Sequence, residues 1–507
     1  MLGNVTLMEF LGGLKAVAHH RPFPRYVIDE RGWKELIHQL SVSDWSLLGI
    51  WGDGSEVHAA FRDDEEEPEA VAVVTLPCPD RKFPTLSEVR PGAIRLERSL
   101  RDLWGITPVG LTDDRPWLDH GRAPTAPLSL HKGPKPEQPH QYVFLPVEGV
   151  ALHQIPVGPV HAGIIEPGHF RFTCAGETVV RLEERLGYTH KGVEGLMTGK
   201  PIMEAAKVAA RISGDSTVAY SLAFARAVEA ASGQEAPPRA HWIRALMAEM
   251  ERIANHLLDI GAICNDAAFA FMLAEMVTLR ERLLQAAKSC FGHRLMMDRI
   301  IPGGVAADLT REGAYSIRAL LAELRRDFER LVDLYDDQPS LQDRTVGTGI
   351  VKSELVHRYG AGGFIARASS RAGDARLSPS YAPYDQLDLT TPLLQAGDVS
   401  ARLWVRIEEV RASLSLIEQI LDGSPGGHHL NPIPARGGEG MALVEAFRGE
   451  ILLWLRLSEV GKVVRCHPRD PSWFQWPLLE AAIEGNIVAD FPLCNKSFNC
   501  SYSGVDL

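Results

Sequence analysis

The side chains of this sequence with the most specific chemistry are its seven cysteines, because thiolates bind zinc, iron–sulfur clusters and other soft metal centres. Closely spaced cysteine pairs are typical of such sites. No CxxC pair occurs here, and the closest two cysteines, Cys494 and Cys500, are six residues apart. The spacing predicts that the chain holds no cluster of its own, and the odd, scattered set indicates reduced thiols in a cytosolic compartment.

A second group of chemically active side chains lies within one predicted helix. Glu249, Arg252 and His256 follow the spacing i, i+3, i+7, which places them on one helix face. Two interpretations stay open: a solvated face, or a buried polar network where the helices of a bundle meet. The glycine-rich run 360–363 is not a phosphate loop, because no GKS or GKT motif and no strand–GxGxxG–helix context accompanies it.

The helix that carries these three residues is one of four with a sustained apolar stripe. Two prolines at 237–238 precede it, and its apolar residues then recur every three or four positions. The other three helices are predicted at about 268–290, 310–335 and 398–423. Four such helices indicate a bundle.

The N-terminal part, residues 1–122, is predicted to form a small α/β domain. Helical spacing covers 33–40, and apolar runs at 47–51 and 71–76 indicate strands. The acidic run 63–69 between the two strands favours a solvated loop.

A proline-rich segment follows this domain. Five prolines crowd residues 123–142, which predicts an extended linker. Residues 143–507 then form the second, mainly helical domain. The predicted fold class is therefore α+β, with a small α/β domain followed by a helical bundle domain.

The overall charge excludes one class of partner. The 507 residues include 53 Lys and Arg against 65 Asp and Glu, a net charge of −12, so we expect no nucleic-acid binding.

No stretch approaches the roughly 18 apolar residues of a membrane-spanning helix, and residues 1–20 lack the features of a signal peptide. We expect a soluble chain that sits on a membrane partner.

Seven separated motifs occur in an order known from one superfamily: 158–163 (GPVHAG), 166–172 (EPGHFRF), 189–192 (THKG), 249–256 (EMERIANH), 292–299 (GHRLMMDR), 302–304 (PGG) and 363–369 (GFIARAS). Together they resemble the large subunit of group 4 NiFe hydrogenases, which include formate hydrogenlyase and hydrogenase-4 component G. They also resemble the homologous quinone-site subunit of respiratory complex I. Residues 97–106 (ERSLRDLWGI) are similar to the smaller peripheral-arm subunit of complex I, which implies a fused, C/D-type chain.

This sequence departs from the hydrogenase pattern at the metal ligands. The resemblance places two cysteine pairs around the nickel–iron centre, but Ser213 and Ser216 occupy the first pair, and Ser501 and Gly504 the second. Hydroxyls stay protonated near neutral pH and are hard donors, whereas the centre needs soft thiolates. We therefore expect a hydrogenase-like scaffold without NiFe ligands, in which Cys494 and Cys500 are ordinary small thiols.

The complex I relatives place a quinone headgroup in the vacated cavity, facing a 4Fe–4S cluster on a partner subunit. The resemblance makes His169 the candidate headgroup ligand, with His161, Ser213 and Ser216 as further cofactor-binding residues. The tyrosine that partners this histidine in complex I falls at Gly214, so the usual pair is not preserved. The histidine beside the terminal cluster likewise corresponds to Met296.

Three residues are candidates for the chemistry itself. Arg211 matches an arginine beside the cluster in both relatives, and a positive charge there raises the reduction potential of the cluster. Glu166 matches the carboxylate that passes protons in hydrogenases. Asp215 adds a carboxylate that the hydrogenase motif lacks. The resemblance also places Asp374 and Arg376 near the cavity and the membrane-facing side.

Three hypotheses follow for the function. The first is a core subunit of the peripheral arm in a membrane-bound oxidoreductase complex, coupling electron transfer from a partner's cluster to ion translocation. Its partners would be a small iron–sulfur subunit and antiporter-type membrane subunits, on the cytoplasmic side of the membrane. The second is a non-catalytic core that bridges these subunits. The third is an active NiFe hydrogenase, which the absent cysteines oppose.

Overall fold

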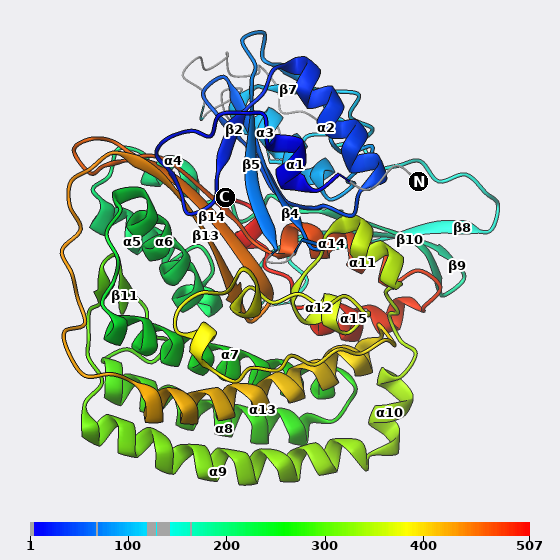
Figure 1. Ribbon diagram of the computed structural model, residues 1–507. Coiled ribbons are helices and arrows are strands. Elements are labelled where there is room, and N and C mark those ends of the chain that lie inside the picture. Colours follow the sequence, from blue (N-terminus) through cyan, green and yellow to red (C-terminus); the bar gives the residue numbers. More distant parts are fainter. Residues whose placement is uncertain (1–4, 67–68, 119–127, 129–141, 163–164) are drawn as a thin grey trace.

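The N-terminal part of the chain is built around a four-stranded sheet. The computed structural model describes residues 5–66, 69–118, 128, 142–162 and 165–507. The strand order is β2–β5–β4–β3, with α3 (Ala93–Trp104) packed on β3 and α1 (Leu7–Leu11) on β5 (Figure 1). The strands are β2 (Arg25–Val27), β3 (Ser46–Asp53), β4 (Glu56–Asp63) and β5 (Ala70–Pro77).

The predicted elements of this part are confirmed, with one exception. Helix α2 (Glu30–Val42) begins after Asp29, which accepts the amide of Gly32, and β3 and β5 contain the two apolar runs. The acidic run is not simply a solvated loop. Asp63 is the buried last residue of β4 and accepts the amide of Leu7, while Asp64 accepts hydrogen bonds from Arg62 and Ser46.

The predicted helix bundle is also confirmed. Helices α7 (Pro238–Asp266), α8 (Ala270–Phe291), α9 (Arg311–Asp336) and α13 (Val399–Gly423) lie side by side in the lower half of Figure 1. Their ends follow local signals: prolines open α7, the side chains of Thr310 and Asp398 cap α9 and α13, and Gly292 ends α8 with a left-handed backbone.

A second four-stranded sheet, which sequence reasoning did not predict, separates the bundle from the N-terminal sheet. Strands β13 (Gly438–Ala446), β14 (Gly449–Leu457) and β15 (Val463–Arg469) are antiparallel, and α6 (Thr217–Ser232) covers β13 and β14. The N-terminal strand β1 (His20–Arg21) completes the sheet by pairing in parallel with β13. The two ends of the chain therefore share one sheet.

A three-stranded antiparallel sheet carries the candidate site residue His169 in β9, and the loop before β9 carries His161 and Glu166. Its order is β10–β9–β8, from β8 (Leu152–Val157), β9 (His169–Ala175) and β10 (Thr178–Arg185). The remaining elements are short: α4 (Val193–Met197), α5 (Ile202–Ala209), α10 (Pro339–Thr345), α11 (Ser353–Tyr359), α12 (Gly363–Arg367), α14 (Ser472–Ala482), α15 (Phe491–Phe498), η1 (Gly214–Ser216), η2 (Arg376–Ser380), η3 (Tyr384–Gln386), η4 (Val488–Asp490), η5 (Ser503–Val505), β6 (Lys82–Pro84), β7 (Thr107–Val109), β11 (Ile300–Ile301) and β12 (Gly304–Val305).

The apolar core joins the two predicted domains. One buried cluster combines side chains of the N-terminal part, such as Trp33 of α2 and Phe61 of β4, with Trp476 and Phe498 from the C-terminal region. The predicted linker 123–142 lies outside the described residues except for its positions 128 and 142, so the domain boundaries stay a prediction. Within the described part of the chain, no helix is both long and apolar enough to cross a membrane.

Candidate functional site

The positions that the sequence comparison assigns to metal ligands come together in space. Ser213 precedes the single turn η1 between α5 and α6, and Ser501 follows α15, 288 residues later. Their hydroxyl oxygens are 3.3 Å apart, and the amide of Gly504 donates to Ser501 Oγ at 2.9 Å. Ser213, Ser216 and Ser501 are all buried. The predicted convergence of these positions is therefore observed.

An ion pair lies at the centre of this group. Arg448, in the turn between β13 and β14, donates to both carboxylate oxygens of Asp215 at 2.9 and 2.6 Å and to Ser216 Oγ at 3.3 Å. Ser213 donates to the same carboxylate at 2.7 Å. Burial alone would raise the pKa of Asp215, but the guanidinium and these hydrogen bonds lower it to about 2.

The donor set of this site does not fit a nickel–iron centre. It offers hydroxyls, one carboxylate and a guanidinium, and an arginine cannot be a metal ligand. The two nearby thiols, Cys494 and Cys500, are buried, and burial raises the pKa of each, for Cys494 to about 11. Both are therefore protonated at neutral pH, as expected for ordinary core thiols.

Replacing Arg448 with methionine tests how much this ion pair stabilises the fold. We expect the unfolding free energy at pH 7 to fall by about 1–2 kcal/mol, because an acceptor loses its charged donor while solvent still screens the 38% exposed Asp215 side chain. The pKa of Asp215 is depressed, so the pair stabilises the protein above the ordinary aspartate pKa and stops doing so as the pH falls toward about 2.

Denaturant unfolding at neutral and acidic pH measures this difference. The difference in unfolding free energy between Arg448→Met and the wild type should become smaller as the pH falls. Asp215→Asn serves as the control, because its stability should lack this pH dependence. An equal difference in unfolding free energy at both pH values would show that the Asp215–Arg448 ion pair does not stabilise the fold.

Glu166 reaches the same C-terminal segment from the loop before β9. Its carboxylate accepts the amide of Ser503 at 3.0 Å, two residues beyond Ser501. On the other side, Asp506 accepts the amide of Thr189 at 2.6 Å. Two matched motifs thus hold the segment that presents Ser501, and Glu166 lies beside the site.

Arg211, by contrast, points to the surface. Its guanidinium binds both oxygens of Asp298 at 2.7 and 2.8 Å, and its side chain is 49% exposed. Lys191 Nζ donates to the carbonyl oxygens of Arg211 and Ile212 at 3.1 and 2.9 Å, which fixes the backbone just before Ser213. The arginine therefore marks the outer face of the site.

The two candidate histidines form a separate group in the β8–β10 region. His169 Nδ1 lies 3.3 Å from the carbonyl oxygen of Gly158, and the ring of His161 packs edge-on against Phe170. Burial lowers the pKa of both, so both are neutral at pH 7. Within the described residues, neither Nε2 atom has a hydrogen-bond partner, and neither histidine contacts Asp215 through a hydrogen bond.

A pocket opens beside Asp215 at Gly214. An added Cβ at Gly214 would meet no described atom within 4 Å. The polar walls include Asp215 and Glu251, and the remaining lining is Met250, Ala254, Asn255, Arg280, Leu283, Leu284, Ala287, Leu295 and Met296. The cavity holds about 20 Å³, enough for one water, whereas an apolar cavity that binds benzene measures about 150 Å³. A quinone ring does not fit into this space as it stands.

Sequence reasoning missed two residues of this site. No motif or spacing in the sequence singles out Arg448. Glu251 belongs to a matched motif but was not singled out, and its two carboxylate oxygens accept the amides of Val218 and Ala219 at the start of α6, at 2.7 and 3.0 Å. Burial raises the pKa of Glu251 to about 8. For Glu249, Arg252 and His256, which left two interpretations open, the structure shows the buried polar network.

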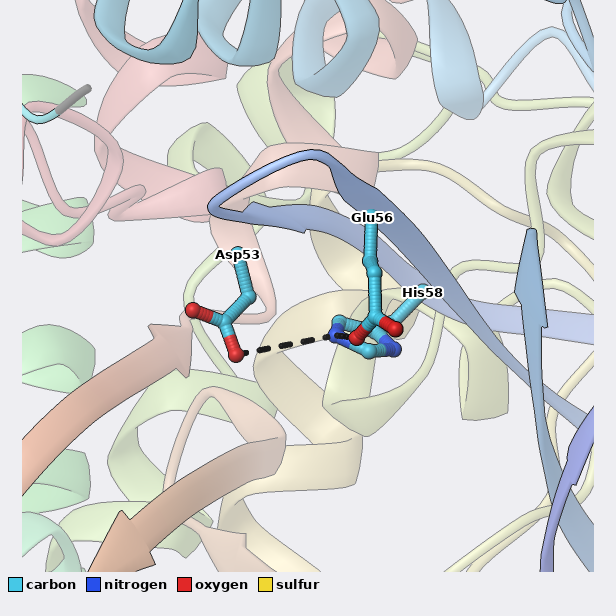
Figure 2. Close-up of side chains that lie close together, drawn as sticks. All are labelled: Asp53, Glu56 and His58. Atoms are coloured by element: carbon cyan, nitrogen blue, oxygen red, sulfur yellow. Dashed lines mark ion pairs between the residues drawn. The ribbon is translucent and has the colours of Figure 1, made fainter. Parts of the chain in front are cut away.

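A further group of possible metal ligands lies in the N-terminal sheet. Asp53 and Glu56 face each other across the β3–β4 hairpin, and His58 Nε2 lies 4.0 Å from Asp53 and 3.8 Å from Glu56 (Figure 2). However, Arg456 Nη1 is 2.6 Å from Asp53, and its other terminal nitrogen is 3.9 Å from Glu56. The guanidinium of Arg456 already pairs with Asp53, so we interpret the group as part of an internal ion-pair network.

Two family models match the sequence. The model of the respiratory-chain NADH dehydrogenase 49-kDa subunit matches residues 259–436 and 431–507. The model of nickel-dependent hydrogenases matches residues 191–260, which include Arg211, Ser213 and Ser216.

Individual relatives are similar over most of the chain. Formate hydrogenlyase subunit 5 of Escherichia coli is 32% identical over 439 residues, 84% of this chain and 77% of that protein. A subunit of the NADH-quinone oxidoreductase of Roseiflexus sp. is 31% identical over 368 residues, 70% of this chain and 98% of that one. A chain of the archaeal membrane-bound sulfane sulfur reductase has a similar fold, with a TM-score of 0.67 and 27% identity over 70% of this chain and 99% of that chain.

Proposed function

Since the chain belongs to the family of large subunits shared by membrane-bound NiFe hydrogenases and respiratory complex I, we propose that it is the peripheral-arm core subunit of a membrane-bound oxidoreductase complex. Its relatives are subunits of such multisubunit membrane complexes. In this proposal the chain performs no NiFe chemistry. It transmits the electrostatic effect of electron transfer in a partner's 4Fe–4S cluster to the rest of the complex.

One observation carries the proposal: the Asp215–Arg448 ion pair lies at the place where Ser213, Ser216 and Ser501 come together. A charged pair at this place would respond to the charge of a nearby cluster, because the Arg448 side chain is buried and a buried charge is screened less than one in bulk water. Glu166, at the adjoining segment, is the group that would take or give a proton.

The partner cluster would lie on the face marked by Arg211. This side chain is exposed and held by Asp298, so its charge is available to a partner that docks there. The pocket beside Gly214 opens near the same segment and has apolar walls with a few polar groups. We propose that the small iron–sulfur subunit binds here and enlarges the pocket with its own residues.

A small electron acceptor of the quinone type would bind at that joint surface. The apolar lining with convergent polar groups is typical of sites for such molecules. The chain would lie on the cytoplasmic side of the membrane, and membrane subunits of the antiporter type would carry the ion whose translocation is coupled to electron transfer.

Purification of the tagged full chain from its own membranes tests this proposal. We expect a small subunit with iron and sulfide and at least one antiporter-type membrane protein to accompany it. Arg211→Glu should lose the iron–sulfur subunit, because it replaces the exposed positive charge beside it. Arg318→Glu is the matched control, since Arg318 is also exposed and paired with an aspartate, Asp422, on a distant helix.

Three outcomes of this purification would contradict the proposal. Recovery of the chain with neither partner would refute the assembly, and stoichiometric nickel in the purified protein would favour an active hydrogenase. Equal retention of the iron–sulfur subunit by Arg211→Glu and the wild type would refute the docking face.

A further inference from the structure

A group of charged side chains is buried where α7, α12, α13 and β13 meet. Each member is at most 5% exposed. We call it the buried charge cluster, and its members are Glu249, Arg252, His256, Arg367, Asp374, Arg376, Glu409 and Glu445.

The charges of this cluster do not balance. Its four carboxylates face three guanidiniums, which leaves one negative charge if His256 is neutral. His256 Nε2 lies 2.7 Å from Glu409, but its Nδ1 is buried without a hydrogen-bond partner among the described residues, and burial lowers its pKa. An uncompensated charge in a buried site is costly. The cluster therefore favours one bound proton on a carboxylate.

The contacts of the carboxylates single out Glu445. Glu409 accepts two bonds from Arg367 at 3.0 and 2.6 Å, and Asp374 accepts two from Arg376 at 2.9 and 2.6 Å. Glu249 is bound by Arg376, Tyr384 and Ser413.

Glu445 has weaker partners than these three acids. It accepts one guanidinium N–H, from Arg367 at 3.1 Å, and the amide of Ala375 at 3.2 Å. Burial and the neighbouring Asp374 raise the pKa of Glu445 to about 7, against the opposing effect of Arg367, Arg252 and Arg376. The pKa values of the other three carboxyls are lowered by their guanidinium partners, which outweigh the effect of burial.

A small cavity gives this carboxyl group a route to water. It is lined by Glu445 and Asp374 on one side and by charged residues at the junction of the two four-stranded sheets on the other, namely Arg62, Arg371, Glu450 and Arg469. Its volume of about 20 Å³ exceeds the roughly 10–15 Å³ that one water needs. Polar walls of this kind hold such a water.

We propose that Glu445 is an exchangeable proton-binding site, loaded and unloaded through the water-sized cavity between the two sheets. The carboxylate takes one proton from a cavity water, which is replenished from bulk water, and returns it by the same route; only O–H bonds form and break, and no electron moves. The groups that face Glu445 directly are Arg252 from α7, Arg367 from α12, Asp374 and Arg376 from the following segment, and the hydroxyl of Tyr381 near its amide. Across the cavity it faces Arg62, Arg371, Glu450 and Arg469.

The proton-binding site lies close to the Asp215–Arg448 ion pair, which suggests that the two are coupled. Glu445 and Arg448 lie three residues apart at the end of β13, and Arg252 donates to the carbonyl oxygens of both Glu445 and Ala446. A charge change at the Asp215–Arg448 pair would therefore change the proton affinity of Glu445. This last step rests on the function proposed above, whereas the proton site itself does not.

Infrared spectroscopy of the full chain, purified with its accompanying subunits, tests the proposal directly. The C=O stretch of a protonated carboxyl group is resolved from the bands of ionised carboxylates. Other buried carboxyl groups, such as Glu251 and Glu97, also have raised pKa values, so the signal of Glu445 is the wild-type spectrum minus that of Glu445→Gln. We expect this difference to contain a component that shifts in D₂O and disappears with a midpoint at pH about 7 when the pH is raised from about 5 to about 9. Glu445→Gln should be tolerated, because the amide resembles the protonated acid.

Glu249→Gln is the matched control, since Glu249 is equally buried but ionised, and it should leave the band in place. A titrating band of equal amplitude in Glu445→Gln and the wild type, or a wild type with no titrating band in this range, would overturn the proposal. If Glu445→Gln does not fold, Glu445→Asp keeps a carboxyl group at this position, and a titrating band identical to that of the wild type would contradict the assignment to Glu445. The outcome is independent of which partners are purified, so it separates this proposal from the proposed function.

Discussion

Replacement of Arg367 with methionine should lower the unfolding free energy by about 3–5 kcal/mol, the range measured when one partner of a buried ion pair is removed. Arg367 is fully buried and donates to Glu409, Glu445 and the carbonyl oxygen of Gly373. Methionine fills much of the space but leaves two buried carboxylates with fewer donors. Urea unfolding at pH 7, followed by circular dichroism of the helix bundle, measures the loss.

Arg411→Met is the matched control for this substitution. Arg411 also binds two acids, Glu329 and Glu408, but all three side chains are about a third exposed or more. Exposed ion pairs contribute about 0–1 kcal/mol, so the control should be nearly neutral. Equal losses for the two variants would show that burial of the cluster has no part in the stability of the bundle.

Replacement of Gly363 with alanine is the second change with a large expected effect. Gly363 opens α12 with a φ of +70°, and an added Cβ would lie 2.0 Å from the carbonyl oxygen of Arg448. A left-handed residue other than glycine costs about 1–2 kcal/mol, and overpacking adds about 1–3 kcal/mol. We expect a loss of about 2–5 kcal/mol in unfolding free energy.

The same clash displaces Arg448 from Asp215. In the proposed function this pair responds to the partner's cluster, so electron transfer through the assembled complex should be slower than in the wild type. Gly362→Ala is the adjacent control, because Gly362 has an ordinary φ of −118° and no described atom within 4 Å of an added Cβ. If both variants retain wild-type stability and rate, the close approach of α12 to the β13–β14 turn is not real.

The sequence predicted those parts of the fold that local signals encode. The four bundle helices begin and end at residues such as Thr310, Asp398 and Gly292, whose side chains or backbone act within one helical turn. Strands β13 and β14 were missed because they are buried on both faces, so their sequences show no alternation of apolar and polar residues. Strand β1 is also too short for a periodic pattern to appear.

The site was predictable only where a motif marked it. Ser213, Ser216 and Ser501 were found because they replace cysteines of a known pattern, and their convergence is observed. Arg448 was missed because its partner Asp215 lies 233 residues away, and no spacing in the sequence connects the two. The roles assigned to Glu166, His161, His169 and Arg211 stay predictions.

The N-terminal sheet packs against strands from the opposite end of the chain, so this packing can form only after most of the chain has been synthesised. Arg465 and Arg469 of β15 donate to the carbonyl oxygens of Gly52 and Leu48 in β3, and Arg465 lies 413 residues after Gly52. At 5–20 residues per second, a ribosome needs about 20–80 s to make that stretch. During this time the nascent sheet leaves the ribosome with one side uncovered, and a chain that stalls before β13 stays exposed to proteases and chaperones.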